Sequence, residues 1–158
     1  MMKKIMSIIL GILAVVTIAG FFFFRSLTHA ETDLNKLDLK NLSGKQVVSA
    51  ELLSKPLIIN YWATWCAPCR QEFPEFQRVK EKLGDKINVV IISDESKSTI
   101  EKFKKNNTYT FDYLISDKKL NMKIRPVTVF YNRKGEAVKQ LIGTTTEEEI
   151  LKIVNSMK

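Results

Sequence analysis

The sequence predicts an α/β domain in which a mixed central sheet is flanked by helices on both faces, preceded by one N-terminal transmembrane helix. Three observations predict this arrangement. Residues 5–24 carry no charge. Strand-like and helix-like segments then alternate, which calls for parallel strands joined by crossover helices. Two strand-like segments around a glycine turn add an antiparallel hairpin near the end, so the sheet should be mixed.

The N-terminal segment has the length of a helix that spans a bilayer. Lys3 and Lys4 precede residues 5–24, and Phe21–Phe24 lead to Arg25. Twenty helical residues extend over about 30 Å, the thickness of the hydrocarbon core. The apolar region of a cleaved signal peptide is usually about 7–15 residues long. We therefore expect a retained anchor, with its N-terminus in the cytoplasm and everything after Arg25 exported.

Cleavage is the alternative, because Thr28-His29-Ala30 is distantly similar to a small-x-small processing site. Both alternatives export the rest of the chain, and a retained anchor would hold it at the extracytoplasmic face of the cytoplasmic membrane. A lipoprotein attachment is excluded, since no cysteine lies near this segment. We divide the chain into a signal-anchor segment, residues 1–30, and one domain, residues 31–158.

Composition allows one domain with an ordinary core. The chain has 158 residues, of which 45% are hydrophobic and 27% charged, with a net charge of +8. The first 30 residues hold three basic groups and no acid, so the other 128 carry 22 basic and 17 acidic groups, a net +5. This charge is spread along the chain and predicts a solvated surface rather than an anion-binding face. We expect no nucleic-acid partner outside the cytoplasm.

The first half of the domain predicts an edge element, a strand and a helix. Residues 31–45 are polar with scattered leucines and indicate a tether followed by a first edge element. Residues 57–62 are apolar and β-rich, which favours a buried strand. A helix over about residues 66–83 should end at Gly84 and be kinked by Pro74. It is predicted by apolar residues at helical spacing: Phe73, Phe76, Val79 and Leu83.

A second strand and a second helix follow. Residues 87–92 are almost continuously aliphatic, as in a strand covered on both faces. Ser96 or Ser98 is a suitable N-cap for a helix that runs to Lys105. Residues 113–115 predict a further short strand.

The end of the chain predicts a hairpin and a last helix. A brief helical turn is expected at residues 118–122. The segments 127–131 and 137–142 flank a turn with a glycine and favour an antiparallel hairpin. Thr146 and Glu149 have the spacing of a capping box that opens the final helix.

Both cysteines lie in one short motif, Trp65-Cys66-Ala67-Pro68-Cys69. Random placement of two cysteines gives this spacing in only about 1% of cases. The strand ends near Trp62 and the helix begins near Cys66, so the first sulfur lies at a helix N-terminus. Unpaired N–H groups and the helix dipole stabilise a thiolate there. Cys69 lies one turn further on, close enough to close a small disulfide ring, and Pro68 suits the first turn.

This geometry predicts the role of each cysteine. Cys66, nearer the solvent, attacks a substrate disulfide, and Cys69 then resolves the mixed disulfide. The redox-active pair is itself the reacting group, so we expect no other cofactor. A permanent structural disulfide is disfavoured because so short a loop constrains the unfolded chain little. A metal site is disfavoured because His29, the one histidine, is remote and no second cysteine pair exists.

These residues resemble the thioredoxin superfamily, and within it the membrane-anchored TlpA/ResA-type thiol-disulfide oxidoreductases. The resemblance covers about residues 45–158. It rests on Asn60-Tyr61-Trp62-Ala63-Thr64-Trp65-Cys66-Ala67-Pro68-Cys69-Arg70-Gln71-Glu72-Phe73-Pro74 and on Pro126-Val127-Thr128-Val129-Phe130. It implies a thioredoxin-like three-layer fold. The family commonly has Pro-Thr-Thr-Phe at the second stretch, so this chain is one residue longer between the proline and the phenylalanine.

The resemblance implies that Pro126 is a cis-proline that faces the cysteine pair. Its lack of an N–H would let a substrate strand lie beside the nucleophile. A trans-proline that only opens a strand is the alternative. The implied substrate groove is bordered by Trp65, Pro68, Arg125 and Pro126. Arg125 would place a positive charge near Cys66 and favour the thiolate.

In ResA-like members a glutamate at the position of Glu72 adjoins the cysteine pair. Glu72 lies three residues after Cys69 and therefore on the same helix face. The resemblance implies a partly buried carboxylate of raised pKa that relays protons between the thiols. Thioredoxins instead keep an aspartate in the preceding strand, where this chain has Asn60. An exposed Glu72 that complements the helix dipole is the alternative.

The predicted function is that of an exported protein thiol-disulfide oxidoreductase. The resemblance implies a reductant of specific exported proteins, with the haem-motif cysteines of apocytochrome c as the usual client. A membrane electron donor of the thiol-transporting type would keep it reduced. An oxidase that inserts disulfides is one alternative, although the chain lacks the inserted helical domain of such oxidases. A non-catalytic thioredoxin-like binding module is another. A peroxiredoxin is a weaker match, because the chain has no Pro-x-x-x-Thr-x-x-Cys segment.

Overall fold

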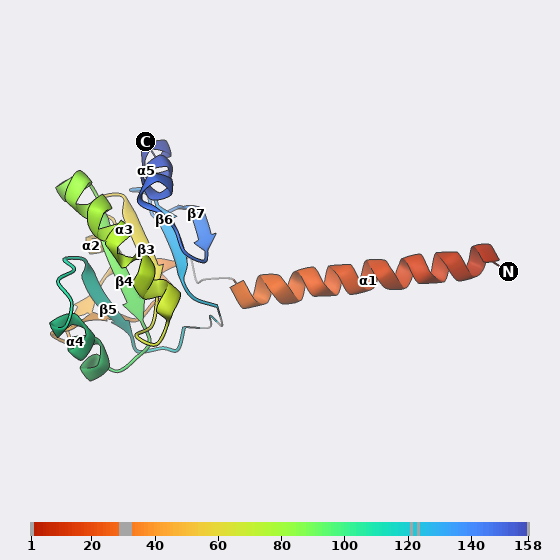
Figure 1. Cartoon of the computed structure of the whole chain (residues 1–158), viewed down its shortest axis with the longest axis horizontal. Helices are drawn as coiled ribbons and strands as arrows, with labels where there is room; N and C mark the ends of the chain where they lie inside the picture. Colours follow the sequence, from red (N-terminus) through yellow and green to blue (C-terminus); the bar gives the residue numbers. More distant parts are fainter. Residues whose placement is uncertain (1, 29–32, 121, 123, 158) are drawn as a thin grey trace.

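The structure is a computed structural model of the whole chain, and it describes residues 2–28, 33–120, 122 and 124–157. Figure 1 shows a long helix that extends away from a compact α/β domain. The elements in chain order are α1 (Met2–Thr28), η1 (Leu34–Lys36), β1 (Leu39–Asn41), β2 (Gln46–Val47), α2 (Ser49–Leu52), β3 (Leu57–Tyr61), α3 (Ala67–Leu83), η2 (Gly84–Lys86), β4 (Asn88–Ser93), α4 (Lys97–Lys105), β5 (Asp112–Ser116), β6 (Val127–Tyr131), β7 (Ala137–Ile142) and α5 (Glu147–Ser156).

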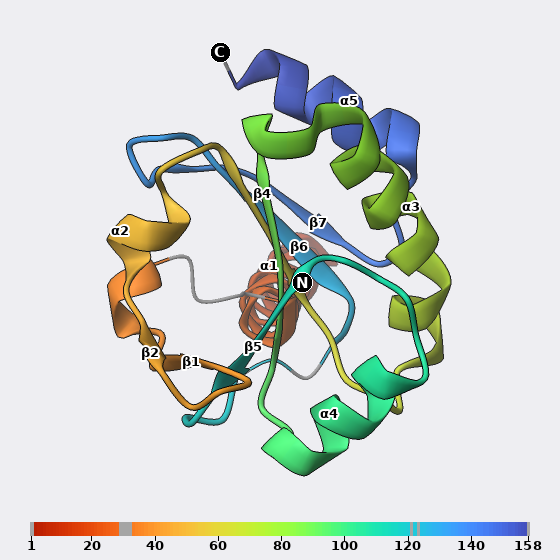
Figure 2. The ribbon, with the colours of Figure 1, turned by 90° about the vertical axis from the view of Figure 1, so that its left-hand side faces the viewer.

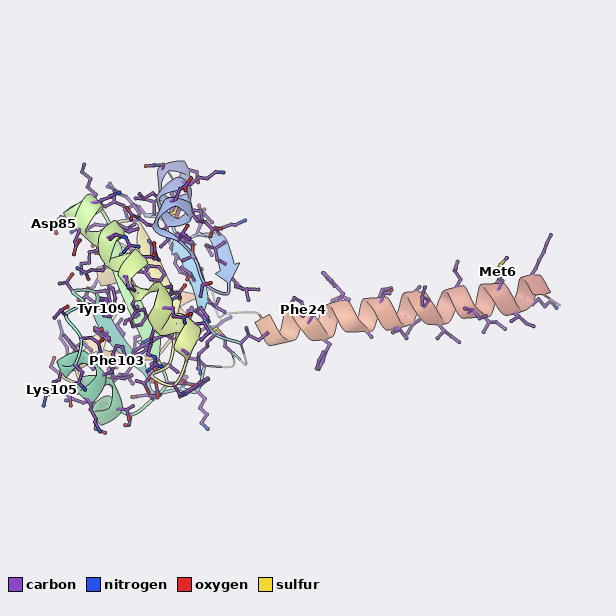
Figure 3. The ribbon with its side chains drawn as sticks, viewed as in Figure 1. Met6, Phe24, Asp85, Phe103, Lys105 and Tyr109 are labelled. Atoms are coloured by element: carbon purple, nitrogen blue, oxygen red, sulfur yellow. A yellow bond between two sulfur atoms is a disulfide. The ribbon has the colours of Figure 1, made fainter. Side chains whose placement is uncertain are left out.

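The N-terminal helix α1 has the length and composition of a membrane span. Residues 3–24 have a mean hydropathy of 2.6, and none of this span is buried against the domain. The side chains of α1, Met6 and Phe24 among them, project outward on all sides in Figure 3. Lipid is the medium in which so many exposed apolar groups are stable. Apart from Thr28, the last residue of α1, the candidate processing site lies outside the described residues, so retention of the anchor stays a prediction.

In the described part of the chain, seven strands form one mixed sheet in the order β2-β1-β5-β4-β3-β6-β7. Strands β3, β4 and β5 are parallel neighbours, and the other pairings are antiparallel. Central strand β3 has Ile59 opposite Val90 of β4 on one side and opposite Val129 of β6 on the other. The carboxyl ends of the three parallel strands lie at the same end of the sheet, where catalytic groups commonly gather in open α/β sheets.

The two faces of the sheet carry separate apolar cores. The residues of β3 and the one that follows it alternate between them: Ile58 and Trp62 face α3, α4 and α5, and Ile59 and Tyr61 face the other way. Figure 2 shows the three longer helices of the domain on one side of the sheet and α2 on the other. The second face is covered by the short elements α2 and η1 together with residues near Met122. The predicted mixed sheet with helices on both faces is confirmed, with most of the helical cover on one face.

Two local predictions need correction. The helical turn expected at residues 118–122 is wrong for the residues that the structure describes there, which form a bend and irregular backbone. Side chains replace helical backbone bonds: the Leu120 N–H donates to Asp94 Oδ2 at 3.1 Å, and Ser116 Oγ donates to the Lys118 carbonyl at 2.7 Å. The first strand, β1, is not the sheet edge either, because β2 pairs outside it.

The helix ends agree with the capping residues of the sequence. Helix α4 is capped by Ser96, whose Oγ accepts the Thr99 N–H. Helix α5 is capped by Thr146, whose hydroxyl accepts the Glu149 N–H. Helix α3 ends at Gly84, where φ is +52°, a conformation that favours glycine. Helix α3 is capped by a cysteine, Cys66, instead of a hydroxyl residue.

Candidate active site

The cysteine pair forms a disulfide at the N-terminus of α3. Cys66 and Cys69 are joined, with their Cα atoms 5.3 Å apart. Cys66 precedes the helix as its N-cap, and its Sγ accepts the Cys69 N–H at 3.3 Å. The helix therefore begins at Ala67 rather than at Cys66. A donor N–H and the positive end of the helix dipole both face the first sulfur, and each favours its thiolate when the pair is reduced.

The first cysteine lies below an exposed rim. Ala67 and Pro68 are exposed, and Trp65 is 67% exposed, although large aromatic side chains are usually buried. Cys66 itself is 4% exposed and Cys69 is fully buried. Of the two cysteines, only Cys66 has exposed surface, which is consistent with its predicted role as the thiolate that attacks a substrate disulfide.

Glu72 is buried in the core beneath the cysteine pair. Its side chain is 1% exposed, which rules out the alternative of a solvated first-turn glutamate. The carboxylate is held on both oxygens: Oε1 accepts Asn60 Nδ2 at 2.7 Å, and Oε2 accepts the Thr145 N–H at 3.1 Å. Asn60 Nδ2 also donates to Thr128 Oγ1 at 3.0 Å. This network joins β3, α3, β6 and the loop before α5.

Burial makes Glu72 a group that titrates near neutrality. Desolvation raises the pKa of Glu72 from 4.5 to about 7, although the bonds from Asn60 and Thr145 stabilise its ionised form and oppose the rise. Asn60 Oδ1 is buried without a hydrogen-bond partner among the described residues. The amide thus leaves an open acceptor close to a carboxyl that gains or loses a proton at pH 7.

The Arg125–Pro126 peptide bond is cis, as the resemblance implies. Pro126 is buried, and its carbonyl accepts the Gly143 N–H at 2.9 Å. The guanidinium carbon of Arg125 lies 5.7 Å from the centre of the Trp65 ring, in a cation–π arrangement. Arg125 is thereby placed beside the cysteine motif, as predicted. Its charge is not free, however, because Asp94 Oδ1 accepts Arg125 Nη2 at 2.8 Å.

Asp94 and Glu95, in the loop between β4 and α4, are functional candidates that the sequence reasoning missed. Glu95 accepts the Thr64 N–H at 2.6 Å on Oε2 and the Thr64 hydroxyl at 2.7 Å on Oε1. It therefore fixes the loop just before Trp65 and Cys66. Their position directly after an aliphatic strand could have indicated them. Because β3 and β4 are parallel neighbours, residues that follow β4 lie close to residues that follow β3.

Aromatic packing holds the start of α3 against the sheet. The Trp62 ring lies 5.0 Å from that of Phe73 and 4.7 Å from that of Phe103, measured between ring centres. Phe73 in turn contacts Phe111 at 5.3 Å and Tyr109 at 5.5 Å. Phe103 and Tyr109 can be followed in Figure 3. Edge-to-face contacts of this kind add to simple burial and restrict ring orientation.

The site as a whole has a disulfide-bonded cysteine at a helix N-terminus, a fully buried partner cysteine one turn further on, a buried carboxyl and a cis-proline. Among the described residues, no group of three His, Cys, Asp or Glu side chains could hold a metal ion. The sequence model of the AhpC/TSA family matches residues 31–139, a stretch that contains both cysteines, Glu72 and Pro126. The chain belongs to the AhpC/TSA family.

Relatives of this AhpC/TSA-family chain carry the TlpA/ResA-type names that the sequence motifs predict. Thioredoxin-like protein YneN of Bacillus subtilis is 29% identical, over 95% of this chain and 96% of its own length. Thiol-disulfide oxidoreductase ResA of Halalkalibacterium halodurans is also 29% identical, over 94% of this chain and 93% of its own. The crystal structure of StoA from Bacillus subtilis superposes with a TM-score of 0.61 at 26% identity, over 73% of this chain and 93% of that one.

The raised pKa of Glu72 predicts how stability depends on pH. Between pH 4.5 and 7 the folded chain keeps a proton that the unfolded chain releases. The contribution of Glu72 to the free energy of unfolding should therefore fall by about 3 kcal/mol across this range and level off above it. The Glu72→Gln variant lacks this group, so the difference in stability between the parent and the variant should fall by the same amount from pH 4 to pH 8. Urea unfolding of the oxidised full chain in detergent measures it.

Glu75→Gln, on the same helix, is a control of opposite sign. Arg78 lowers the pKa of Glu75, so the parent should gain stability relative to this variant as pH rises. Parallel curves for the parent and Glu72→Gln would contradict the assignment of a neutral-pH titration to Glu72.

Proposed function

We propose that this thiol-disulfide oxidoreductase works as a reductant of protein disulfides at the extracytoplasmic face of the cytoplasmic membrane. The relatives named ResA support the reaction class. The uninterrupted apolar span of α1, with Lys3 and Lys4 before it, supports an anchor with its N-terminus in the cytoplasm. The observation that carries the proposal is a redox-active pair at a helix N-terminus beside a buried carboxyl.

The reaction proceeds in two exchanges. The Cys66 thiolate attacks one sulfur of a substrate disulfide, the substrate S–S bond breaks, and the other substrate sulfur leaves as a thiolate that takes up a proton. Cys69 then loses its proton and attacks Cys66 Sγ, which forms the disulfide seen in the structure and releases the second substrate thiol. Two electrons pass from the pair to the substrate. A membrane electron donor of the thiol-transporting type returns them.

Glu72 supplies the base for the second exchange in this proposal. Cys69 is fully buried, so its thiol cannot pass a proton directly to bulk water. Glu72 lies one helical turn after Cys69, on the face of α3 that is buried against the sheet, and its pKa is about 7. A base whose pKa is near the working pH is the most effective one for such a transfer.

The charges around Cys66 favour a reductant over an oxidant. A strongly oxidising pair owes its potential to a stabilised thiolate in the reduced form. Here the nearby Arg125 is paired with Asp94, so it adds little to that stabilisation. When ionised, the buried carboxylate of Glu72 repels a second negative charge on the cysteine pair. The first contact withholds a stabilisation of the thiolate and the second opposes the thiolate, and a less stabilised thiolate gives the pair a lower reduction potential.

The clients proposed here are exported proteins with accessible disulfides, with the haem-motif cysteines of apocytochrome c as the specific candidate. The exposed rim of Trp65 and Pro68, next to buried Pro126, offers an uncovered surface for such a chain. No nucleic-acid or metal partner is part of the proposal.

Cysteine variants test the order of attack. Cys69→Ala leaves the mixed disulfide unresolved, so it should accumulate covalent adducts with the substrate and reveal the client by mass spectrometry after capture from membranes. Cys66→Ser should lose insulin-disulfide reduction to the uncatalysed level. A parent chain without insulin-disulfide reduction would favour a binding module, and a fully active Cys66→Ser chain would reject Cys66 as the nucleophile. The absence of an adduct with Cys69→Ala would reject the assigned roles.

The pH profile of exchange tests the proton relay. The single-turnover rate with which the reduced chain reduces a peptide disulfide should rise through pH 7 as Glu72 ionises. In Glu72→Gln this inflection should vanish, with a rate about a hundredfold lower at pH 8. Stopped-flow fluorescence between pH 5 and pH 9 measures this single-turnover rate in the parent and in the variant. An unchanged profile in the variant excludes the relay and leaves Glu72 as a structural group.

The reduction potential of the pair decides the direction. Equilibration with glutathione or dithiothreitol buffers should give a value near about −270 mV, as for thioredoxin-type reductants. A value near about −120 mV would instead identify a disulfide-inserting oxidase.

A further inference from the structure

Arg125, beside the cysteine motif, is a cation whose charge is already balanced. Arg125 lies over the exposed ring of Trp65, the residue before Cys66, and is itself followed by Pro126. A substrate chain that brings its disulfide to Cys66 must therefore pass close to this guanidinium. An unpaired arginine at such a place attracts acidic residues and repels basic ones.

Asp94 is built into the fold as the partner of this cation. Its Oδ1 accepts Arg125 Nη2 at 2.8 Å, and its Oδ2 accepts the Leu120 N–H at 3.1 Å, so both oxygens are engaged. The Arg125 and Asp94 side chains are only 9% and 17% exposed. The pair is shielded from water. Its mutual attraction is therefore stronger than that of an ion pair at the surface. The neighbouring residue, Glu95, holds Thr64, which fixes the loop that carries Asp94.

We propose that Asp94 sets the substrate preference of this site: by neutralising Arg125 it removes the selection for acidic sequence around a client disulfide. The site then accepts disulfides with little regard to the charge of the flanking residues. Asp94 acts through Arg125 and is a positioning residue that determines specificity. The part of this inference that concerns client peptides rests on the proposed reductase function.

The first test compares peptides. Three disulfide-linked peptides that differ only in having glutamate, lysine or glutamine beside the cysteine are reduced by the parent and by Asp94→Asn. In about 10 mM salt, where the Debye length is roughly 30 Å, we expect the ratio of kcat/KM for acidic over basic peptide to rise about tenfold in Asp94→Asn. The rise should shrink at about 0.5 M salt, which a purely structural defect would not cause.

A mirror variant keeps the test decisive if Asp94→Asn folds poorly. Arg125→Gln leaves Asp94 without its partner, so the same ratio should shift in favour of the basic peptide. The matched control is Asp85→Asn, which makes the same change of charge at the other end of β4, where Asp85 is fully exposed beside Lys55. It should leave the ratio at the parent value. Arg70 and Glu95 are present in every variant, so the differences report the Arg125–Asp94 pair.

A second test does not depend on turnover. In the reduced Cys69→Ala background, Cys66 is the only thiol, and its thiolate displaces iodide from either iodoacetate or neutral iodoacetamide. Both alkylation rates are proportional to the fraction of Cys66 that is thiolate, so this fraction cancels in their ratio. The ratio then reports the charge around Cys66, because only iodoacetate is charged. Asp94→Asn should raise the preference for iodoacetate severalfold at low salt.

An unchanged ratio in folded Asp94→Asn, in both assays, overturns the proposal, as does an Arg125→Gln variant without the opposite shift. If the parent fails to reduce even the glutamine peptide, the reductase function is wrong, and the alkylation ratio still decides the role of Asp94.

Discussion

The site depends on one constraint, the burial of a single stripe of α3 against the sheet. Its buried residues recur at helical spacing: Cys69, Glu72, Phe73, Phe76 and Val79. Burying the side chains of Phe73, Phe76 and Val79 contributes about 1.5–3 kcal/mol each. Their sum, about 5–9 kcal/mol, exceeds the roughly 3 kcal/mol that burying Glu72 costs at neutral pH. The same contact that stabilises the helix thus brings a carboxyl into the core. It also places Cys69 out of reach of solvent and leaves Cys66 at the helix end, where its sulfur faces the rim.

The parallel pairing of β3 and β4 adds the second part of the site. Because Tyr61 lies opposite Ile92, the loops that follow the two strands emerge side by side. Glu95 can then bind Thr64, and Asp94 can reach across to Arg125. Glu95 accepts hydrogen bonds from the loop after β3, and Asp94 balances the charge of Arg125 in the loop before β6. The loops after β3 and β4 and the loop before β6 are therefore fixed relative to one another. The electrostatic state of Cys66 is therefore a property of the sheet topology as much as of its own helix.

Periodicity and spacing predicted the parts of the site that are local in sequence. The helix start at the cysteine motif follows from the strand that ends before it, and the caps Ser96 and Thr146 are the kind of residue that helix ends prefer. The cis-proline was implied by family resemblance, since sequence physics alone does not distinguish cis from trans. The turn expected near Lys118 failed because side chains outcompeted backbone bonds there: the Ser116 hydroxyl donates to the Lys118 carbonyl, and Asp94 accepts the Leu120 N–H. The short elements η1 and α2 contain too few residues to give a periodic signal.

The contacts that give the site its chemistry join residues far apart in the chain. Thr145 binds Glu72 across 73 positions, and Arg125 binds Asp94 across 31. No pattern within a window of sequence contains both partners, so such pairs appear only once the sheet order is known.

Glu72 shows why these long-range contacts matter for function. Burial alone would keep its carboxyl protonated well above neutrality, but the Asn60 amide and the Thr145 N–H each stabilise the ionised form. The opposing effects leave the pKa at about 7, where the two protonation states have similar free energies. Asn60 itself cannot titrate, so the strand contributes a donor where thioredoxins keep an acid, and the helix contributes the acid. In the proposed relay, a proton from Cys69 is taken up and released within one redox cycle without a large free-energy step in either direction.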